Sequence, residues 1–160
     1  MSDNFDKAFK IVVGEEGGYV NNPKDPGGET KFGISNSSYP TLDIKNLTID
    51  QAKDIYRRNY WNRVDGDEFP YEIALPLFDA AINEGVSEAI IQLQQAAGVT
   101  PDGVMGHNTI EAVKSKDPDQ LLALFMAREF NFKTHLKIWL TFGLGWLRRG
   151  FRIVVQAIRG

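Results

Sequence analysis

The chain has 160 residues, 42% of them apolar, and a net charge of −3, which is the composition of an ordinary soluble globular protein. It contains no cysteine, which excludes a disulfide framework and a thiolate metal site. The charge is uneven, because the first 129 residues carry 12 basic and 21 acidic side chains, whereas the last 31 carry six basic side chains and no carboxylate.

The hydrophobic pattern predicts a mainly α fold class. Apolar residues at positions 5, 8, 9, 12 and 13 follow the helical repeat and predict an amphipathic helix that runs to Gly17-Gly18. Residues 19–35 are rich in Pro, Gly and Asn, which predicts a small loop-rich or β-hairpin lobe. Further helices are expected across 70–83 and from the capping residues Thr48, Ser87, Asn108 and Asp117. The tail is expected to break at 141–145 and then to resume as a helix.

Glu16 is the candidate for acid–base chemistry. It follows Phe5 by eleven positions and so falls about 20° from Phe5 around the helix axis, whereas Glu15 falls about 80° to the other side. Burial on the apolar side of this helix and the negative end of the helix dipole both raise the pKa of a carboxyl, so that it keeps its proton. Glycosidases use such a group to protonate the leaving sugar oxygen. The alternative is a late helix residue that the diglycine turns toward solvent.

The residues around Glu16 carry a resemblance to a known family. The stretch Glu-Gly-Gly-Tyr-Val-Asn-Asn-Pro-Lys-Asp-Pro-Gly-Gly-Glu-Thr-Lys-Phe-Gly-Ile at 16–34 resembles the signature of glycoside hydrolase family 108. That family comprises N-acetylmuramidases found as phage endolysins and as bacterial factors that open the wall for secretion. Weaker matches extend the resemblance over almost the whole chain, at 55–61, 77–85, 93–99, 102–109 and 145–149. The resemblance implies a lysozyme-like single domain.

The resemblance also implies roles for individual residues. Glu16 would be the general acid on the bond between N-acetylmuramic acid and N-acetylglucosamine. Asp25 is the candidate for the second carboxylate, which would position or activate water, and Glu29 is its rival. Thr30 could hold the attacking water or only satisfy the short strand, and Asp25 lies in Asp-Pro-Gly-Gly, which is also strong turn chemistry. The sequence leaves inversion, retention and lytic transglycosylation open.

Four residues are predicted to bind the glycan strand: Tyr19, Glu29, Asp79 and Asn83. Tyr19 lies next to the acid and outside any helical pattern, whereas the aromatic residues at 56, 60 and 61 have helical spacing and are expected in the core. Asp79 and Asn83 are four apart on one helix, which the resemblance places along the sugar cleft. A solvated or capping pair near Gly85 is the alternative for Asp79.

The chain is expected to form a lysozyme-like catalytic lobe at 1–90 and a helical lobe at 91–160, with a peptidoglycan-binding-like segment and a basic tail. In the tail, aromatic residues at 139, 142, 146 and 151 interleave with Arg148, Arg149 and Arg152. This pattern suits anionic outer-membrane lipid, but it equally suits a helix that packs its aromatics on the core. No cofactor, metal or nucleic acid is expected, and the chain is expected to be a monomer.

The leading prediction is therefore an endolysin-like peptidoglycan hydrolase that acts on glycan strands. The alternative is a non-catalytic protein that binds the wall or disrupts membranes through its basic tail. The N-terminus lacks a secretory signal, and the longest uncharged stretch of the tail, 138–147, is shorter than the roughly 20 residues of a membrane span. We expect synthesis in the cytoplasm and access to the wall through a membrane pore.

Overall fold

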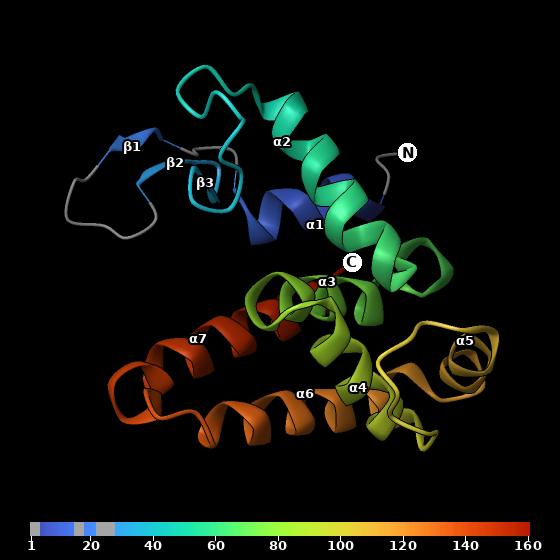
Figure 1. Ribbon diagram of the computed structural model, residues 1–160. Helices are drawn as coiled ribbons and strands as arrows, with labels where there is room; N and C mark the ends of the chain where they lie inside the picture. The colour runs from blue at the N-terminus through green and yellow to red at the C-terminus, as the bar shows by residue number, and fades with distance from the viewer. Residues whose placement is uncertain (1–3, 15–17, 22–27) are drawn as a thin grey trace. The chain divides into compact units, whose positions relative to one another are not determined.

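The computed structural model describes residues 4–14, 18–21 and 28–160 (Figure 1). It is mainly helical with one small antiparallel sheet, which confirms the predicted fold class. Its contacts divide the chain into two compact units, Met1–Asn59 and Tyr60–Gly160. The expected lobe boundary at residue 90 stays a prediction. Within the described residues, no helix is both long and apolar enough to cross a membrane.

The first unit combines two helices and the sheet. Helix α1 (Asn4–Val12) and helix α2 (Ile49–Tyr56) contribute the rings of Phe9 and Tyr56, which meet edge to face with centroids 5.6 Å apart. Lys53 of α2 forms an ion pair with Asp6 of α1 at 3.0 Å. Thr48 caps α2 with the predicted capping box.

The sheet has the order β1-β2-β3 and consists of β1 (Val20–Asn21), β2 (Glu29–Lys31) and β3 (Ile34–Ser35). Val20 pairs with Thr30 across the first two strands, and Thr30 pairs with Ser35 across the last two. Phe32 and Gly33 form the β2–β3 turn with φ of 51° and 74°, as a two-residue type I′ hairpin requires. The Tyr56 hydroxyl donates to the Phe32 carbonyl at 3.0 Å, which ties this turn to α2.

The second unit surrounds helix α3. After the short helices η1 (Arg57–Trp61), η2 (Asn62–Val64) and η3 (Gly66–Glu68), the chain forms α3 (Tyr71–Glu84), α4 (Val86–Ala97), α5 (His107–Lys114), α6 (Pro118–Thr134) and α7 (Trp139–Ala157). Helix α3 packs against α4, α6 and α7, and α6 lies alongside α7 (Figure 1). Trp61 is fully buried, meets Phe78 edge to face and donates to Asp67, which confirms its expected place in the core.

The predicted helix ends in this unit are confirmed in one case and wrong in three. Asp117 caps α6 and accepts from the backbone of Gln120, as predicted. The caps predicted at Ser87 and Asn108 are wrong, because the N-caps of α4 and α5 are Gly85 and Gly106, two residues earlier in each case. The predicted break at 141–145 is also wrong, since α7 is one helix of 19 residues.

Gln94 fastens the 98–106 loop to the helices on either side. Its buried amide nitrogen donates to Asp102 at 2.7 Å, to the Val104 carbonyl at 3.0 Å and to Thr109 at 3.0 Å, and its oxygen accepts from the Gly103 backbone at 2.9 Å. One side chain thus satisfies a turn that would otherwise hold unpaired polar groups. The suggestion that this segment binds the wall stays a prediction.

We expect Gln94→Leu to lower the free energy of unfolding by about 2–3 kcal/mol, because it removes the hydrogen bonds of a buried side chain and leaves the buried Thr109 hydroxyl without this partner. Gln95→Leu is the matched control, since Gln95 is the next residue of α4 and is exposed. Urea unfolding of both variants checks this. Equal loss of stability in the two variants would contradict the anchoring role of Gln94.

Candidate functional site

The two residues predicted to act on the glycosidic bond, Glu16 and Asp25, lie outside the described residues. The structure nevertheless corrects the reasoning that singled out Glu16. Helix α1 ends at Val12, and Gly14 has φ of 83°, a left-handed conformation that ends a helix. The predicted helix up to Gly17-Gly18 is therefore wrong, and the helical phase of Phe5 no longer supports a buried position for Glu16. The role of Glu16 now depends on its motif.

Three of the predicted site residues lie at the sheet: Glu29 and Thr30 belong to β2, and Tyr19 immediately precedes β1. The Tyr19 hydroxyl donates to Glu29 Oε1 at 2.6 Å, and this hydrogen bond is the main reason that the pKa of Tyr19 is raised. Side chains alternate between the two faces of a strand, so Glu29 and Thr30 project from opposite faces of β2. One face of the sheet therefore presents the Tyr19–Glu29 pair, and the other presents Thr30 beside its partners Val20 and Ser35.

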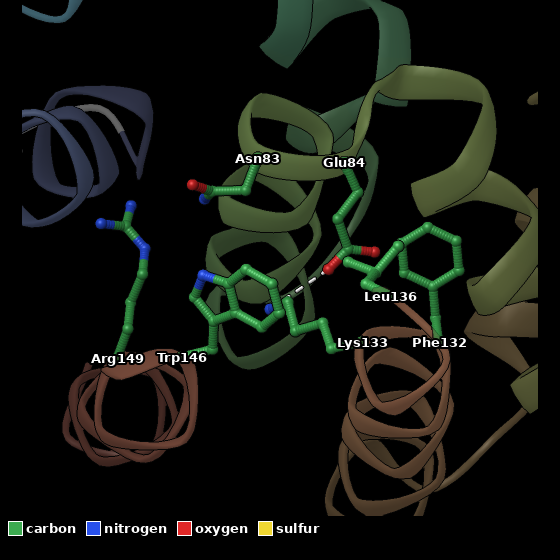
Figure 2. Close-up of a pocket in the computed structure, with 7 residues that line it drawn as sticks. All are labelled: Asn83, Glu84, Phe132, Lys133, Leu136, Trp146 and Arg149. Carbon is green, nitrogen blue, oxygen red and sulfur yellow. Dashed lines mark ion pairs between the residues drawn. The ribbon is translucent and has the colours of Figure 1, made fainter. Parts of the chain in front are cut away.

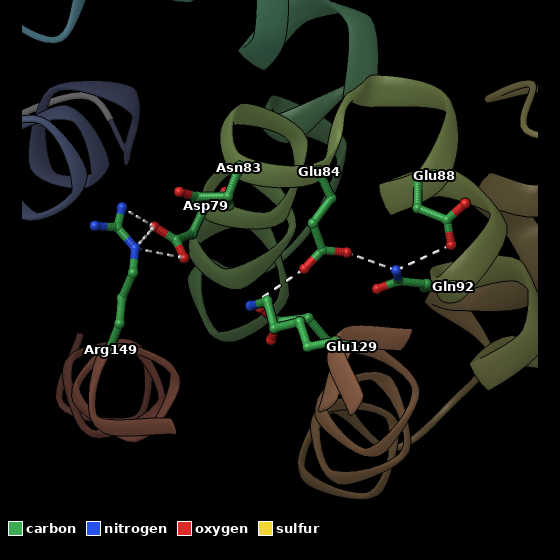
Figure 3. Close-up of polar contacts among 8 residues, drawn as sticks. Asp79, Asn83, Glu84, Glu88, Gln92, Glu129 and Arg149 are labelled. Atoms are coloured by element: carbon green, nitrogen blue, oxygen red, sulfur yellow. Dashed lines mark hydrogen bonds and ion pairs between the residues drawn. The ribbon is translucent and has the colours of Figure 1, made fainter. Parts of the chain in front are cut away.

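The other two predicted site residues, Asp79 and Asn83, lie one turn apart on α3. Asp79 is only 3% exposed, so it is not the solvated residue that the sequence allowed as an alternative. Its carboxylate binds the Arg149 guanidinium through Nε at 3.0 and 3.2 Å and through Nη2 at 2.5 Å (Figure 3). Asn83 is exposed and donates its amide nitrogen to the Asp79 carbonyl at 2.7 Å. Asp79 thus fixes Arg149, while the Asn83 side-chain oxygen has no partner among the described residues.

We expect Arg149→Met to lower the free energy of unfolding by about 3–5 kcal/mol, because it leaves the Asp79 carboxylate buried without its counter-ion. Arg148→Met is the matched control, since Arg148 is the preceding residue of α7 and is exposed. Thermal and denaturant unfolding at neutral pH measure the difference. A loss below about 1 kcal/mol, the size typical of exposed ion pairs, would show that this pair is not a buried structural contact.

A pocket of about 270 Å³ opens beside this ion pair (Figure 2). The Trp146 indole stands across it, with Asn83 and Arg149 toward one side and the Glu84–Lys133 pair toward the other. The remaining walls are apolar and come from Phe132 and Leu136. An aromatic ring among a few fixed polar groups is a typical lining of a small-molecule site.

The polar end of the pocket continues into a buried charge cluster (Figure 3). The Lys133 ammonium contacts Glu84 at 3.1 Å and donates a very short hydrogen bond to Glu129, and each of these three side chains is at most 7% exposed. Gln92 donates to the other Glu84 oxygen at 2.6 Å and to Glu88 at 3.1 Å. Two buried carboxylates thus share one ammonium.

The cluster has strongly altered proton affinities. Burial raises the pKa of Glu84 from 4.5 to about 7, although Lys133 and Gln92 act in the opposite direction. Burial also raises the pKa of Glu129. Burial alone would lower the pKa of Lys133, but the two carboxylates outweigh it and raise that pKa. The cluster therefore tends to keep one proton on its carboxylates near neutral pH.

The residues of this cluster escaped prediction. Glu129 and Lys133 are four apart, which on most helices marks an exposed ion pair, and nothing near them in sequence indicates burial. Glu84 falls within the stretch 77–85 that carries the family resemblance, but the resemblance implies no role for it. In the part of the chain that the structure describes, no three histidine, aspartate or glutamate side chains are grouped as a metal site would require.

Comparisons with known proteins agree with the resemblance. The glycosyl hydrolase 108 family matches residues 9–85. Among solved structures, the chain is similar to SagA of Brucella abortus, with 37% sequence identity and a TM-score of 0.85. That alignment covers 97% of this chain and 94% of the SagA chain. No curated protein matches the chain. Because this identity extends over almost all of both chains and the family model matches residues 9–85, the chain belongs to the glycosyl hydrolase 108 family.

Proposed function

We propose that this glycoside hydrolase is an N-acetylmuramidase, which hydrolyses the bond between N-acetylmuramic acid and N-acetylglucosamine in peptidoglycan. The observation that carries the proposal is the Glu-Gly-Gly-Tyr motif at 16–19, which lies inside the stretch matched to the family. Glu16 is the general acid of the proposed reaction. It protonates the leaving sugar oxygen as the glycosidic bond breaks.

A second carboxylate completes the proposed mechanism. Asp25 is the candidate that activates water, with Glu29 as its rival. The hydrogen bond from Tyr19 counts against Glu29, because it occupies the Oε1 atom and fixes the side chain on one face of β2. If Asp25 activates the water from the opposite side of the sugar ring, the anomeric configuration inverts. Without a working base, the muramic acid 6-hydroxyl could replace water and the enzyme would be a lytic transglycosylase.

Two surfaces are proposed to contact the glycan, each within its own unit. In the first unit, the Tyr19 ring is 37% exposed and its hydroxyl is held by Glu29, which suits stacking on a sugar face. In the second unit, the pocket presents the Trp146 indole, the side-chain amide of Asn83 and the Arg149 guanidinium. Asp79, which was predicted to bind substrate, is proposed to position Arg149 instead, since it is buried beneath that side chain.

The products of digestion test the proposal. Purified peptidoglycan is incubated with the protein, the soluble fragments are reduced with borohydride, and mass spectrometry identifies the reduced sugar. We expect reduced N-acetylmuramic acid. Reduced N-acetylglucosamine would show that the other glycosidic bond is cut, and anhydro-muramic ends would identify a transglycosylase. Free peptides with intact glycan would overturn the assignment to a glycosidase.

The alternative, a non-catalytic protein that disrupts membranes through its tail, makes the opposite prediction. It would kill cells without releasing any sugar fragment, and Glu16→Gln would kill as well as the parent protein. We favour the enzyme because family membership extends across the motif that carries Glu16.

A further inference from the structure

Helix α7 carries an exposed apolar stripe that the proposed muramidase reaction does not use. At 100° per residue, its members fall within about 60° of one another around the helix. They are Leu140, Leu144, Phe151, Val155 and the C-cap residue Ile158. The first two are the most exposed, at 96% and 67%. We call these five residues the apolar stripe. The Phe151 ring also packs against that of Phe130, with centroids 5.8 Å apart. A row of exposed apolar side chains along one helix is typical of a binding surface.

Cations lie directly along one edge of the apolar stripe. Arg148 and Arg152 occupy the next roughly 40° of the helix surface, and Arg159 directly follows the C-cap of α7. All three arginines are exposed. No residue after Glu129 has a carboxylate side chain, so no acidic side chain of α7 neutralises them. Arg149 does not belong to this row, because it turns toward α3 and binds Asp79.

The same geometry revises the expectation for the tail. Of the four aromatic residues that interleave with arginines in sequence, Phe151 belongs to the apolar stripe, whereas Trp139, Phe142 and Trp146 lie elsewhere around the helix. Trp146 lines the pocket, and its ring packs against those of Trp139 and Phe142 with centroids 6.2 Å apart in both cases. The buried side of α7 is formed by Gly143, Gly150, Ile153 and Ala157, about 120° from the apolar stripe.

We propose that the apolar stripe and its arginine row bind the surface of an anionic phospholipid bilayer. A helix that lies in the interface buries its apolar face among the acyl chains while its arginines stay at the level of the headgroup phosphates. Phosphate oxygens supply the negative charge that α7 lacks, and each arginine near such a surface strengthens binding. A second copy of the chain fits less well, because an antiparallel two-fold pairing of the apolar stripes would bring two arginine rows to the same edge.

Vesicle binding tests the proposal. The full chain is sedimented with vesicles of phosphatidylglycerol and phosphatidylethanolamine, and separately with neutral phosphatidylcholine vesicles, at low and high salt. We expect binding to the anionic vesicles only, and weaker binding at high salt. Leu140→Gln/Leu144→Gln should weaken it by about tenfold or more, because both side chains would otherwise be buried in the bilayer. Arg148→Gln/Arg152→Gln should weaken it by about tenfold and reduce the salt dependence.

Two matched controls keep the test specific. Val104→Gln/Leu124→Gln removes exposed apolar side chains elsewhere in the same unit, and Lys45→Gln/Lys116→Gln removes two exposed cations. Both controls should bind like the parent protein, and circular dichroism should show that every variant is folded. Absence of binding by the parent protein, equal affinity for neutral vesicles, or unchanged binding of the leucine variant would overturn the proposal. A parent dimer that the leucine variant converts to monomer would assign the stripe to a second copy instead.

Discussion

Replacement of Glu16 by glutamine is expected to reduce the rate of peptidoglycan hydrolysis by about a thousandfold, since general acid catalysis contributes roughly 10²–10⁴-fold. Glutamine keeps the size of the side chain but cannot donate the proton that the leaving sugar oxygen needs. Release of soluble muropeptides from purified walls measures the rate. The expected loss is in the chemical step, so binding of the variant to insoluble peptidoglycan should stay within about twofold of the parent protein.

Glu15 provides the matched control for this experiment. It is the neighbouring carboxylate, and the family motif begins at the next residue, so Glu15→Gln should retain most of the activity. Full activity in Glu16→Gln, or an equal loss in both variants, would contradict the role of Glu16 as the general acid. Thermal unfolding of the two variants should match, because a difference in folding would otherwise explain a difference in rate.

The second carboxylate can be identified in the same assay. We expect Asp25→Asn to lose about a hundredfold in rate if Asp25 activates the water. Glu29→Gln should lose much less, because glutamine can still accept the hydrogen bond from Tyr19. The reverse order would assign the base to Glu29 and would make Tyr19 its positioning residue.

Sequence patterns predicted the parts of this fold that local chemistry decides. The capping box at Thr48 and the Asp117-Pro118 helix start are written within a few residues, and both are confirmed. The continuity of α7, by contrast, cannot be predicted from a few neighbouring residues. Gly143 and Gly150 resemble helix breakers, but each lies under an aromatic ring: an added Cβ would come within 2.8 Å of Trp139 and 2.6 Å of Phe130, respectively. These glycines allow close packing and do not end the helix.

In the candidate site, too, features decided by neighbouring residues are predictable and features decided by helix packing are not. The assignments of Glu16 and Tyr19 come from the family motif and stay predictions. Helical phase does not support Glu16, because α1 ends at Val12 and a helix boundary cannot be predicted to within a few residues. The Asp79–Arg149 pair joins residues 70 apart, and Lys133 of α6 meets Glu84 of α3. Such pairings depend on how the helices pack, and periodicity within one helix contains no information about them.

The buried cluster around Lys133 makes the second strong prediction. A carboxyl whose pKa is higher in the folded than in the unfolded state binds its proton more tightly when folded, and it therefore favours folding while it is protonated. For Glu84 this contribution is present below pH 4.5 and is lost as pH rises to about 7. We expect the free energy of unfolding to fall between pH 5 and pH 8 by an amount on the order of 3 kcal/mol. Urea unfolding across this range measures it.

Two substitutions in the cluster and one control outside it test whether this decline in stability comes from the cluster. Glu84→Gln should remove most of the decline and should be at least as stable as the parent protein at pH 8, because Lys133 then faces the single charge of Glu129. Glu111→Gln, at an exposed carboxyl of α5, should leave the decline unchanged. Lys133→Met should lower stability at pH 8 by about 3–5 kcal/mol, since it leaves two buried carboxylates without a cation. If stability instead rises between pH 5 and pH 8 in the parent protein, the cluster does not retain its proton.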